Sequence, residues 1–139
     1  MIVVDTSVLY ALLDRRDAHH AAATTWYERT DEALATTPLV LAETDHLAAA
    51  RAGRAAQAAF RADVAAGAYE VAWWREASGQ AVTVAERHVD LGVDLTDASL
   101  VALAARLDTL RIATFDERHF RAIRPLTGGA AFVLAPADG

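Results

Sequence analysis

The chain has 139 residues, of which 54% are hydrophobic and 23% are charged, and its formal net charge is −6. A chain of this length usually forms one domain, so we expect a single domain over residues 1–139 with one hydrophobic core. It contains no cysteine, and all of its basic residues are arginine. The composition therefore excludes disulfide scaffolds, cysteine-ligated zinc and enzymes that need a catalytic cysteine or lysine.

The hydropathy pattern predicts where the protein resides. Asp5 ends the short apolar run that opens the chain, no basic segment precedes that run, and no apolar stretch reaches the roughly 18 residues of a membrane helix. We therefore expect a cytoplasmic protein without a signal peptide or membrane contact. The acidic net charge argues against binding nucleic acid through overall charge, so such a contact would depend on local arginines or metal ions.

The first half of the chain is predicted to be largely helical. A β-branched run at residues 2–4 predicts a buried strand, followed by a helix at about residues 6–13. Further helices are expected at about residues 19–29, 38–51 and 54–66. Thr37 and Pro38 suit an N-cap and a first helical position, and Gly53 suits a helix end. Residues 69–73 then predict a strand.

The second half continues the alternation of helices and strands. Helices are expected at about residues 75–89, at 97–107 with Thr96 as N-cap, and at 117–123. Strands are expected at residues 111–115 and 131–134. Because strands separated by helices pair in parallel, we predict an α/β fold, a parallel sheet of four to five strands with helices on both faces.

Four acidic residues occupy positions typical of a ligand site. Asp5 and Asp116 each follow a predicted strand directly, at the carboxyl edge of the sheet, where open α/β folds bind ligands. Asp97 lies in the first turn of a helix, and Glu43 lies within an apolar helical segment. Singly, each acid could serve as a cap or an ion-pair partner. Together, such carboxylates need a cation to remain ionised, and oxygen ligands favour Mg²⁺ or Mn²⁺.

The sequence around these acids resembles the PIN-domain nucleases, and most closely the VapC-type toxins of bacterial toxin–antitoxin pairs. The matching segments are residues 3–7, 41–46, 95–99 and 114–120, the last followed by Arg124 and Pro125. The order and spacing of the four segments carry the resemblance, which covers nearly the whole chain. Residues of about 53–90 match only in their helical character.

The resemblance implies a metal-dependent endoribonuclease with an RNA substrate, a partner antitoxin and a homodimeric state. The implied catalytic acids, which would hold Mg²⁺ or alternatively Mn²⁺, are Asp5, Glu43, Asp97 and Asp116. Candidate accessory residues are Thr6, Ser7, Asp94 and Thr114. Candidate RNA contacts are Arg118 and Arg121.

Several histidines and tryptophans keep more than one interpretation. His46 follows Glu43 by three residues, as in one half of a di-iron site, but the chain has no second Glu-x-x-His motif. His119 could contact RNA, act beside Asp116, or be a buried hydrogen-bonded histidine. Trp73 and Trp74 are expected on opposite faces of a strand, one of them in the core.

Two other functions remain open at this stage. A non-catalytic module of the same fold would act through protein contacts, although clustered acids without an ion would only repel one another. A phosphatase resembling the haloacid-dehalogenase type would also use an aspartate after the first strand. That family needs a second aspartate where this chain has Ser7, and it needs a lysine, which this chain lacks.

Overall fold

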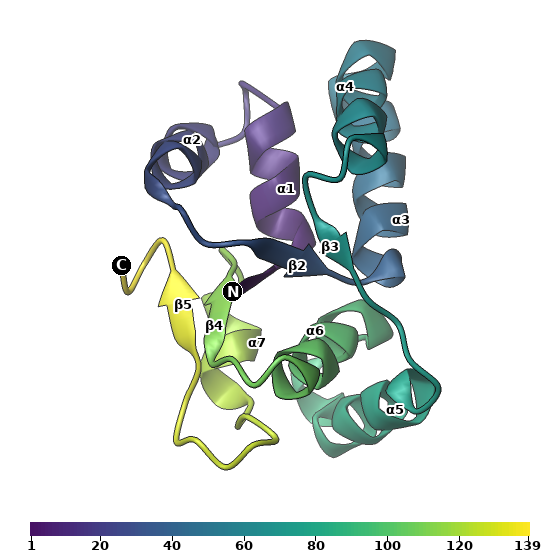
Figure 1. Ribbon diagram of the computed structural model, residues 1–139, viewed down its shortest axis with the longest axis vertical. Coiled ribbons are helices and arrows are strands. Elements are labelled where there is room, and N and C mark those ends of the chain that lie inside the picture. Colours follow the sequence, from purple (N-terminus) through teal and green to yellow (C-terminus); the bar gives the residue numbers. More distant parts are fainter.

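A parallel sheet of five strands forms the centre of the computed structural model, which describes residues 1–139 (Figure 1). The strands are β1 (Ile2–Val4), β2 (Leu34–Thr36), β3 (Glu70–Val71), β4 (Arg111–Ala113) and β5 (Val133–Ala135). Their order across the sheet is β3-β2-β1-β4-β5, and every neighbouring pair is parallel. The predicted α/β class and parallel pairing are confirmed.

Helices cover both faces of this sheet. The α-helices are α1 (Thr6–Leu13), α2 (His20–Arg29), α3 (Pro38–Leu47), α4 (Arg54–Ala65), α5 (Ala77–Arg87), α6 (Leu95–Arg106) and α7 (Glu117–Ala122). Short π and 3₁₀ segments, η1 (Ala48–Ala52) and η2 (Val89–Leu91), follow α3 and α5. In Figure 1, α1 and α2 lie on one side of the sheet, α5 and α6 lie on the other, and α3 and α4 pair beside α1. None of these helices combines the length and apolar character needed to cross a bilayer.

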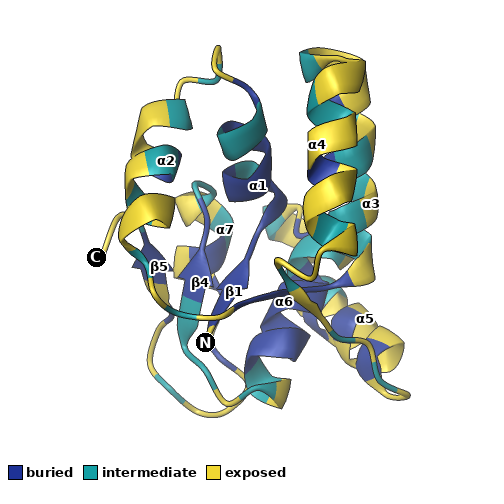
Figure 2. Cartoon of the chain, turned by 45° about the horizontal axis from the view of Figure 1, so that its top comes forward, coloured by how far each residue is buried: buried dark blue, intermediate teal, exposed yellow.

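The core is centred on β1 and α6. All three residues of β1 are fully buried, with Ile2 in register with Leu34 and Val3 in register with Ile112. A strand that is covered on both faces consists of consecutive apolar residues, which explains why apolar and polar residues do not alternate in Ile2–Val4. Figure 2 shows β1, β4 and much of α6 buried, whereas α4 is largely exposed.

Three local predictions were wrong. Strand β2 was not predicted, since Leu34–Thr36 is too short to show a periodic pattern. The expected strand at residues 69–73 is reduced to Glu70–Val71, so Trp73 and Trp74 follow β3 in an irregular segment. Helix α6 begins at Leu95, and its N-cap is Asp94, whose Oδ1 accepts the Asp97 N–H at 2.8 Å, instead of Thr96.

The order in which strands are added to the sheet reverses between β1 and β4. From β1 the chain moves outward through β2 and β3, and then returns to the other side of β1 to add β4 and β5. In open α/β sheets, ligands bind at such a switch point, beyond the carboxyl ends of the strands. Asp5 directly follows β1 here, and its N–H donates to the Ala113 carbonyl at the end of β4 at 2.9 Å.

Candidate active site

The four predicted acids line one pocket at this switch point. The pocket has a volume of about 400 Å³ and is lined by Asp5, Glu43, Asp97 and Asp116. Three of the predicted accessory residues, Thr6, Ser7 and Asp94, also line it. The remaining lining residues are Tyr10, Asp17, His19, Leu47, Arg51 and His119. Acids from four separate elements of the chain therefore meet in one place.

Asp5 is buried and held by two hydroxyl groups. Ser7 Oγ and Thr114 Oγ1 each donate to Asp5 Oδ2 at 2.8 Å, so neither of them holds Oδ1. The same hydroxyl oxygens accept backbone N–H groups, from Phe115 at 3.0 Å for Ser7 and from Asp116 at 2.9 Å for Thr114. Burial raises the pKa of Asp5, which is only 4% exposed, against the opposing effect of these hydrogen bonds. An adjacent cation would offset that cost of burial.

Asp97 and Asp116 share one histidine. His119 Nδ1 lies 2.9 Å from Asp97 Oδ2 and 3.0 Å from Asp116 Oδ2. On the other side of the ring, Nε2 lies 3.1 Å from the carbonyl oxygen of Leu91. Burial, followed by repulsion from Asp94 and Asp5, raises the pKa of Asp97 to about 7. Of the interpretations open for His119, the structure supports a partly buried residue within the acid cluster.

Glu43 reaches the pocket from α3 without a partner of its own. It is half-buried and forms no ion pair, so the ordinary interpretation, pairing with an arginine, finds no support. The start of α3 is fixed by Thr37, whose hydroxyl accepts the Val40 N–H at 3.4 Å. Thr37 Oγ1 also lies 2.8 Å from Ser99 Oγ on α6. This buried contact connects the helix that carries Glu43 with the helix that carries Asp97.

The donor set fits a divalent cation. One donor atom from each of Asp97, Asp116 and His119 lies within 4.8 Å of the others, and no other group of three metal-ligating side chains is as close. Thr6 gives independent support for a ligand in this pocket, since its Oγ1 is buried there and has no hydrogen-bond partner. A buried hydroxyl without a partner carries a free-energy cost that a bound water or oxyanion would remove.

The arginines in and around the pocket differ in their partners. Arg121, a predicted RNA contact, pairs with Asp138 at 2.7 Å and with Glu117 at 2.8 Å, so its charge is already neutralised. Arg118 is exposed and forms no ion pair. Arg51, at the end of η1, lines the pocket although the sequence analysis did not select it. Its contribution depends on the packing of η1 beside α1, which no sequence motif signals.

His19 also lines the pocket. Its ring stacks on Phe115, with centroids 4.2 Å apart and planes at 10°. Its N–H donates to the neighbouring Asp17 Oδ1 at 2.8 Å. His20 Nδ1 instead faces the Ala11 carbonyl at 2.6 Å. Asp17, His19 and His20 do not form a close group of metal-ligating side chains.

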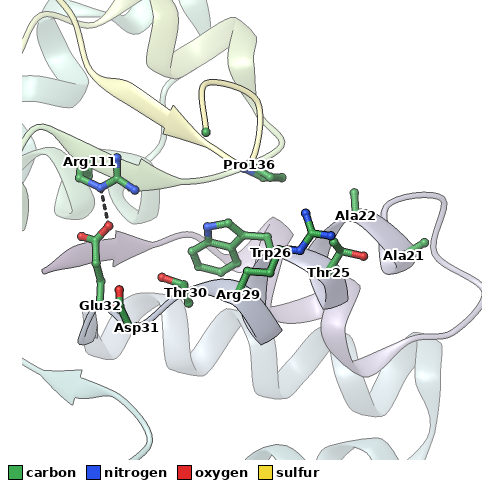
Figure 3. A pocket seen from close by; sticks show the side chains of 11 residues that line it. Ala21, Ala22, Thr25, Trp26, Arg29, Thr30, Asp31, Glu32, Arg111 and Pro136 are labelled. Atoms are coloured by element: carbon green, nitrogen blue, oxygen red, sulfur yellow. Dashed lines mark ion pairs between the residues drawn. The ribbon is translucent and has the colours of Figure 1, made fainter.

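A larger pocket, of about 750 Å³, is drawn in Figure 3 and shares no lining residue with the pocket of the four predicted acids. It is bordered by Trp26 and Arg29 on α2, and by Glu32 and Arg111, which precede β2 and begin β4. Its Glu32 pairs with Arg111 at 2.8 Å, so this carboxylate is already neutralised. The only close group of metal-ligating side chains lies in the smaller pocket, so chemistry that requires clustered carboxylates is assigned to that pocket at the carboxyl ends of the strands.

Comparisons with known proteins agree with this architecture. Ribonuclease VapC26 of Mycobacterium tuberculosis (strain ATCC 25618 / H37Rv) is 38% identical over 136 residues, which is 97% of this chain and all of that protein. The crystal structure of Mycobacterium tuberculosis VapC20, described as a sarcin-ricin loop cleaving toxin, superposes with a TM-score of 0.79 at 26% identity. That superposition covers 84% of this chain and 91% of VapC20. Since the family model of the PIN domain also matches residues 2–125, this chain belongs to the PIN-domain family.

Proposed function

We propose that this protein is a metal-dependent endoribonuclease and the toxin of a toxin–antitoxin pair. The observation that carries the proposal is the convergence of Asp5, Glu43, Asp97 and Asp116 on one pocket at the switch point of the sheet. Its similarity along nearly the whole chain to a VapC ribonuclease supports the same chemistry. The similarity in fold to an RNA-cleaving VapC toxin supports the biological role.

The four acids would together hold Mg²⁺ or Mn²⁺. When bound, the ion supplies a water of lowered pKa and stabilises the charge that develops on the phosphate. Ser7 and Thr114 orient Asp5 by donating to its Oδ2, and Glu43 adds a carboxylate that no other side chain neutralises. The buried Thr6 hydroxyl, free of other partners, would donate to a phosphate oxygen entering the pocket.

RNA would be held by local cations because the chain as a whole is acidic. Arg51 lines the pocket, and Arg118 is exposed and unpaired on α7 beside Asp116. Both would contact phosphates next to the cleaved bond. Arg121 would contribute less, since contact with RNA competes with Asp138 and Glu117.

The toxin role implies further partners. We propose that a cognate antitoxin inhibits the protein, that two copies associate as a homodimer, and that both processes take place in the cytoplasm. The resemblance to VapC proteins supports these three statements. Size-exclusion chromatography with light scattering would give the mass of the free protein. Co-expression with the protein of a neighbouring gene would test for an antitoxin through co-purification and loss of cleavage.

The direct test is RNA cleavage by the purified protein with Mn²⁺, Mg²⁺ or EDTA. Substrates are total RNA and an oligonucleotide of the sarcin-ricin loop, the RNA cleaved by the structural relative. We expect metal-dependent cutting that Asp5→Asn abolishes and that Asp63→Asn, a change of an exposed acid on α4, leaves intact.

Thermal stability measured with Mn²⁺ separates the alternatives. Stabilisation by the ion without cutting would mean that the metal site is present and that the correct RNA is missing from the assay. The absence of both cutting and stabilisation would contradict the proposal and would support a non-catalytic binding module.

A further inference from the structure

The environment of His119 leaves one ring nitrogen directed at the acid cluster. The Leu91 carbonyl can only accept a hydrogen bond, so Nε2, 3.1 Å away, carries a proton and donates to it. That bond fixes the orientation of the ring and directs Nδ1 to a point between Asp97 and Asp116. Histidines that bind metals through one nitrogen usually donate the other N–H to a backbone carbonyl or a carboxylate.

We propose that His119 coordinates the catalytic ion directly through Nδ1. This inference rests on the proposed metal-dependent function, and it extends the all-oxygen ligand set expected from the sequence to a mixed set of oxygen and nitrogen. The histidine comes from α7, three residues after Asp116, which is the N-cap of that helix and accepts the His119 N–H at 3.2 Å through Oδ1. Asp97 is supplied by α6 and the Leu91 carbonyl by η2, so three elements define the site.

The distances between the donor atoms agree with ligation. Neighbouring ligand atoms of an octahedral ion with bonds of about 2.1 Å lie about 3.0 Å apart. The separations from Nδ1 to the two carboxylate oxygens are 2.9 and 3.0 Å. These two separations match those of neighbouring ligands on one ion, and all three donor atoms lie within 4.8 Å of one another. The limited exposure of two of them, 15% for His119 and 14% for Asp97, would also restrict the number of waters that remain on the ion.

A nitrogen ligand changes which metals bind best. Imidazole suits transition metals, whereas Mg²⁺ prefers oxygen ligands alone. We therefore expect His119 to favour Mn²⁺ over Mg²⁺. His119→Gln should weaken Mn²⁺ binding about tenfold or more and change Mg²⁺ binding much less, because the change removes a nitrogen ligand.

The competing explanation gives His119 a positioning role only. A doubly protonated ring could hold the two carboxylates by ion pairing and never contact the ion. The same separations of 2.9 and 3.0 Å fit that role. Activity measurements cannot separate the two roles, since both predict slower cleavage in His119→Gln.

Pulsed electron paramagnetic resonance on the Mn²⁺-loaded protein separates them. A nitrogen bonded to Mn²⁺ produces a ¹⁴N modulation, and labelling with [¹⁵N]histidine identifies that nitrogen as belonging to an imidazole. His19 is the only other histidine that lines the pocket, so His19→Gln is the matched control. Because that variant retains His119, the test does not depend on the folding of His119→Gln.

We expect a histidine ¹⁴N modulation in the wild type and in His19→Gln, and its loss in His119→Gln. Mn²⁺ binding without histidine modulation in the wild type would overturn the proposal and leave the carboxylate nuclease intact. Loss of the modulation in His19→Gln alone would overturn it as well, by assigning the ligand to His19. Absence of any Mn²⁺ binding in a titration would contradict the proposed function together with this inference.

Discussion

Thr114 Oγ1 donates a 2.8 Å hydrogen bond to Asp5 Oδ2, joining the segment after β4 to the segment after β1. The two residues are 109 positions apart in the chain, yet both are buried at the switch point of the sheet. The Thr114 oxygen also accepts the Asp116 N–H at 2.9 Å. One hydroxyl group therefore fixes the positions of two of the acids assigned to the metal.

Removing this hydroxyl should weaken metal binding. In Thr114→Val the shape is kept, but Asp5 loses a donor and the Asp116 N–H loses its acceptor. We expect Mn²⁺ affinity to fall by about tenfold and stability by about 1–2 kcal/mol. Isothermal titration and chemical denaturation measure the two effects.

Thr114→Ser, which retains the hydroxyl, should behave like the wild type. Thr109→Val tests specificity, since Thr109 makes a similar pair of bonds, to the Met1 carbonyl and the Arg111 N–H, away from the acids. Equal losses of metal affinity in Thr109→Val and Thr114→Val would contradict the role given to Thr114.

Glu43 should be needed for activity but not for stability. It has no ion-pair partner, and it lines the same pocket as three other acids. Glu43→Gln removes a like charge from that group, so with EDTA the melting temperature should stay equal or rise. Cleavage of RNA should fall at least about 100-fold, because a candidate metal ligand is lost.

The matched control for this change is Glu86→Gln on α5, an exposed glutamate that does not line the pocket. Glu86→Gln should alter neither RNA cleavage nor the melting temperature in EDTA. A lower melting temperature of Glu43→Gln in EDTA would show that Glu43 has a structural partner after all.

The sequence predicted the parts of the fold whose signals are local. The β-branched run of β1 and the Thr37–Pro38 start of α3 each carry a strong preference of their own, and both appear as expected. β2 has no such signal, since Leu34–Thr36 is a strand because β1 and β3 flank it. Tertiary pairing decided its conformation, since Leu-Ala-Thr lacks the β-branched run that identifies the equally short β1.

The same distinction applies to the site. Asp5 and Asp116 could be placed from the rule that ligand sites follow the strands of a parallel sheet. The surroundings of His119 could not, because its contact with Leu91 joins residues 28 positions apart through a 3₁₀ turn. Arg51 likewise reaches the pocket only through the packing of a π-helical segment. Such contacts depend on long-range geometry that periodicity does not encode.

The stability of the metal-free protein should depend on pH around neutrality. Burial and repulsion from neighbouring acids raise the pKa of Asp97 to about 7. Burial opposes the charged form of His119, but the hydrogen bond that His119 donates to Asp97 raises its pKa overall. Both groups thus bind protons more tightly in the folded chain than in the unfolded chain. The stability that they contribute is present at lower pH and is lost as pH rises through about 7.

In EDTA, the free energy of unfolding should therefore fall between about pH 6 and pH 8, as measured by urea denaturation. Saturating Mn²⁺ should remove much of this fall, since the ion takes the place of the protons. Asp97→Asn should flatten the metal-free profile, whereas Asp63→Asn should not. A metal-free stability that rises over this interval would contradict the assignment.

The buried contact between Thr37 and Ser99 should contribute to both stability and activity. Ser99 Oγ donates to the Thr96 carbonyl at 2.6 Å, so Thr37 must be the donor in the 2.8 Å contact with Ser99. Thr37→Val removes this bond and the cap on α3, and should cost about 1 kcal/mol of unfolding free energy. Because α3 carries Glu43 and α6 carries Asp97, Mn²⁺ affinity should fall as well. Thr37→Ser should retain both properties, and a loss of stability with unchanged metal affinity would show that the contact does not position the acids.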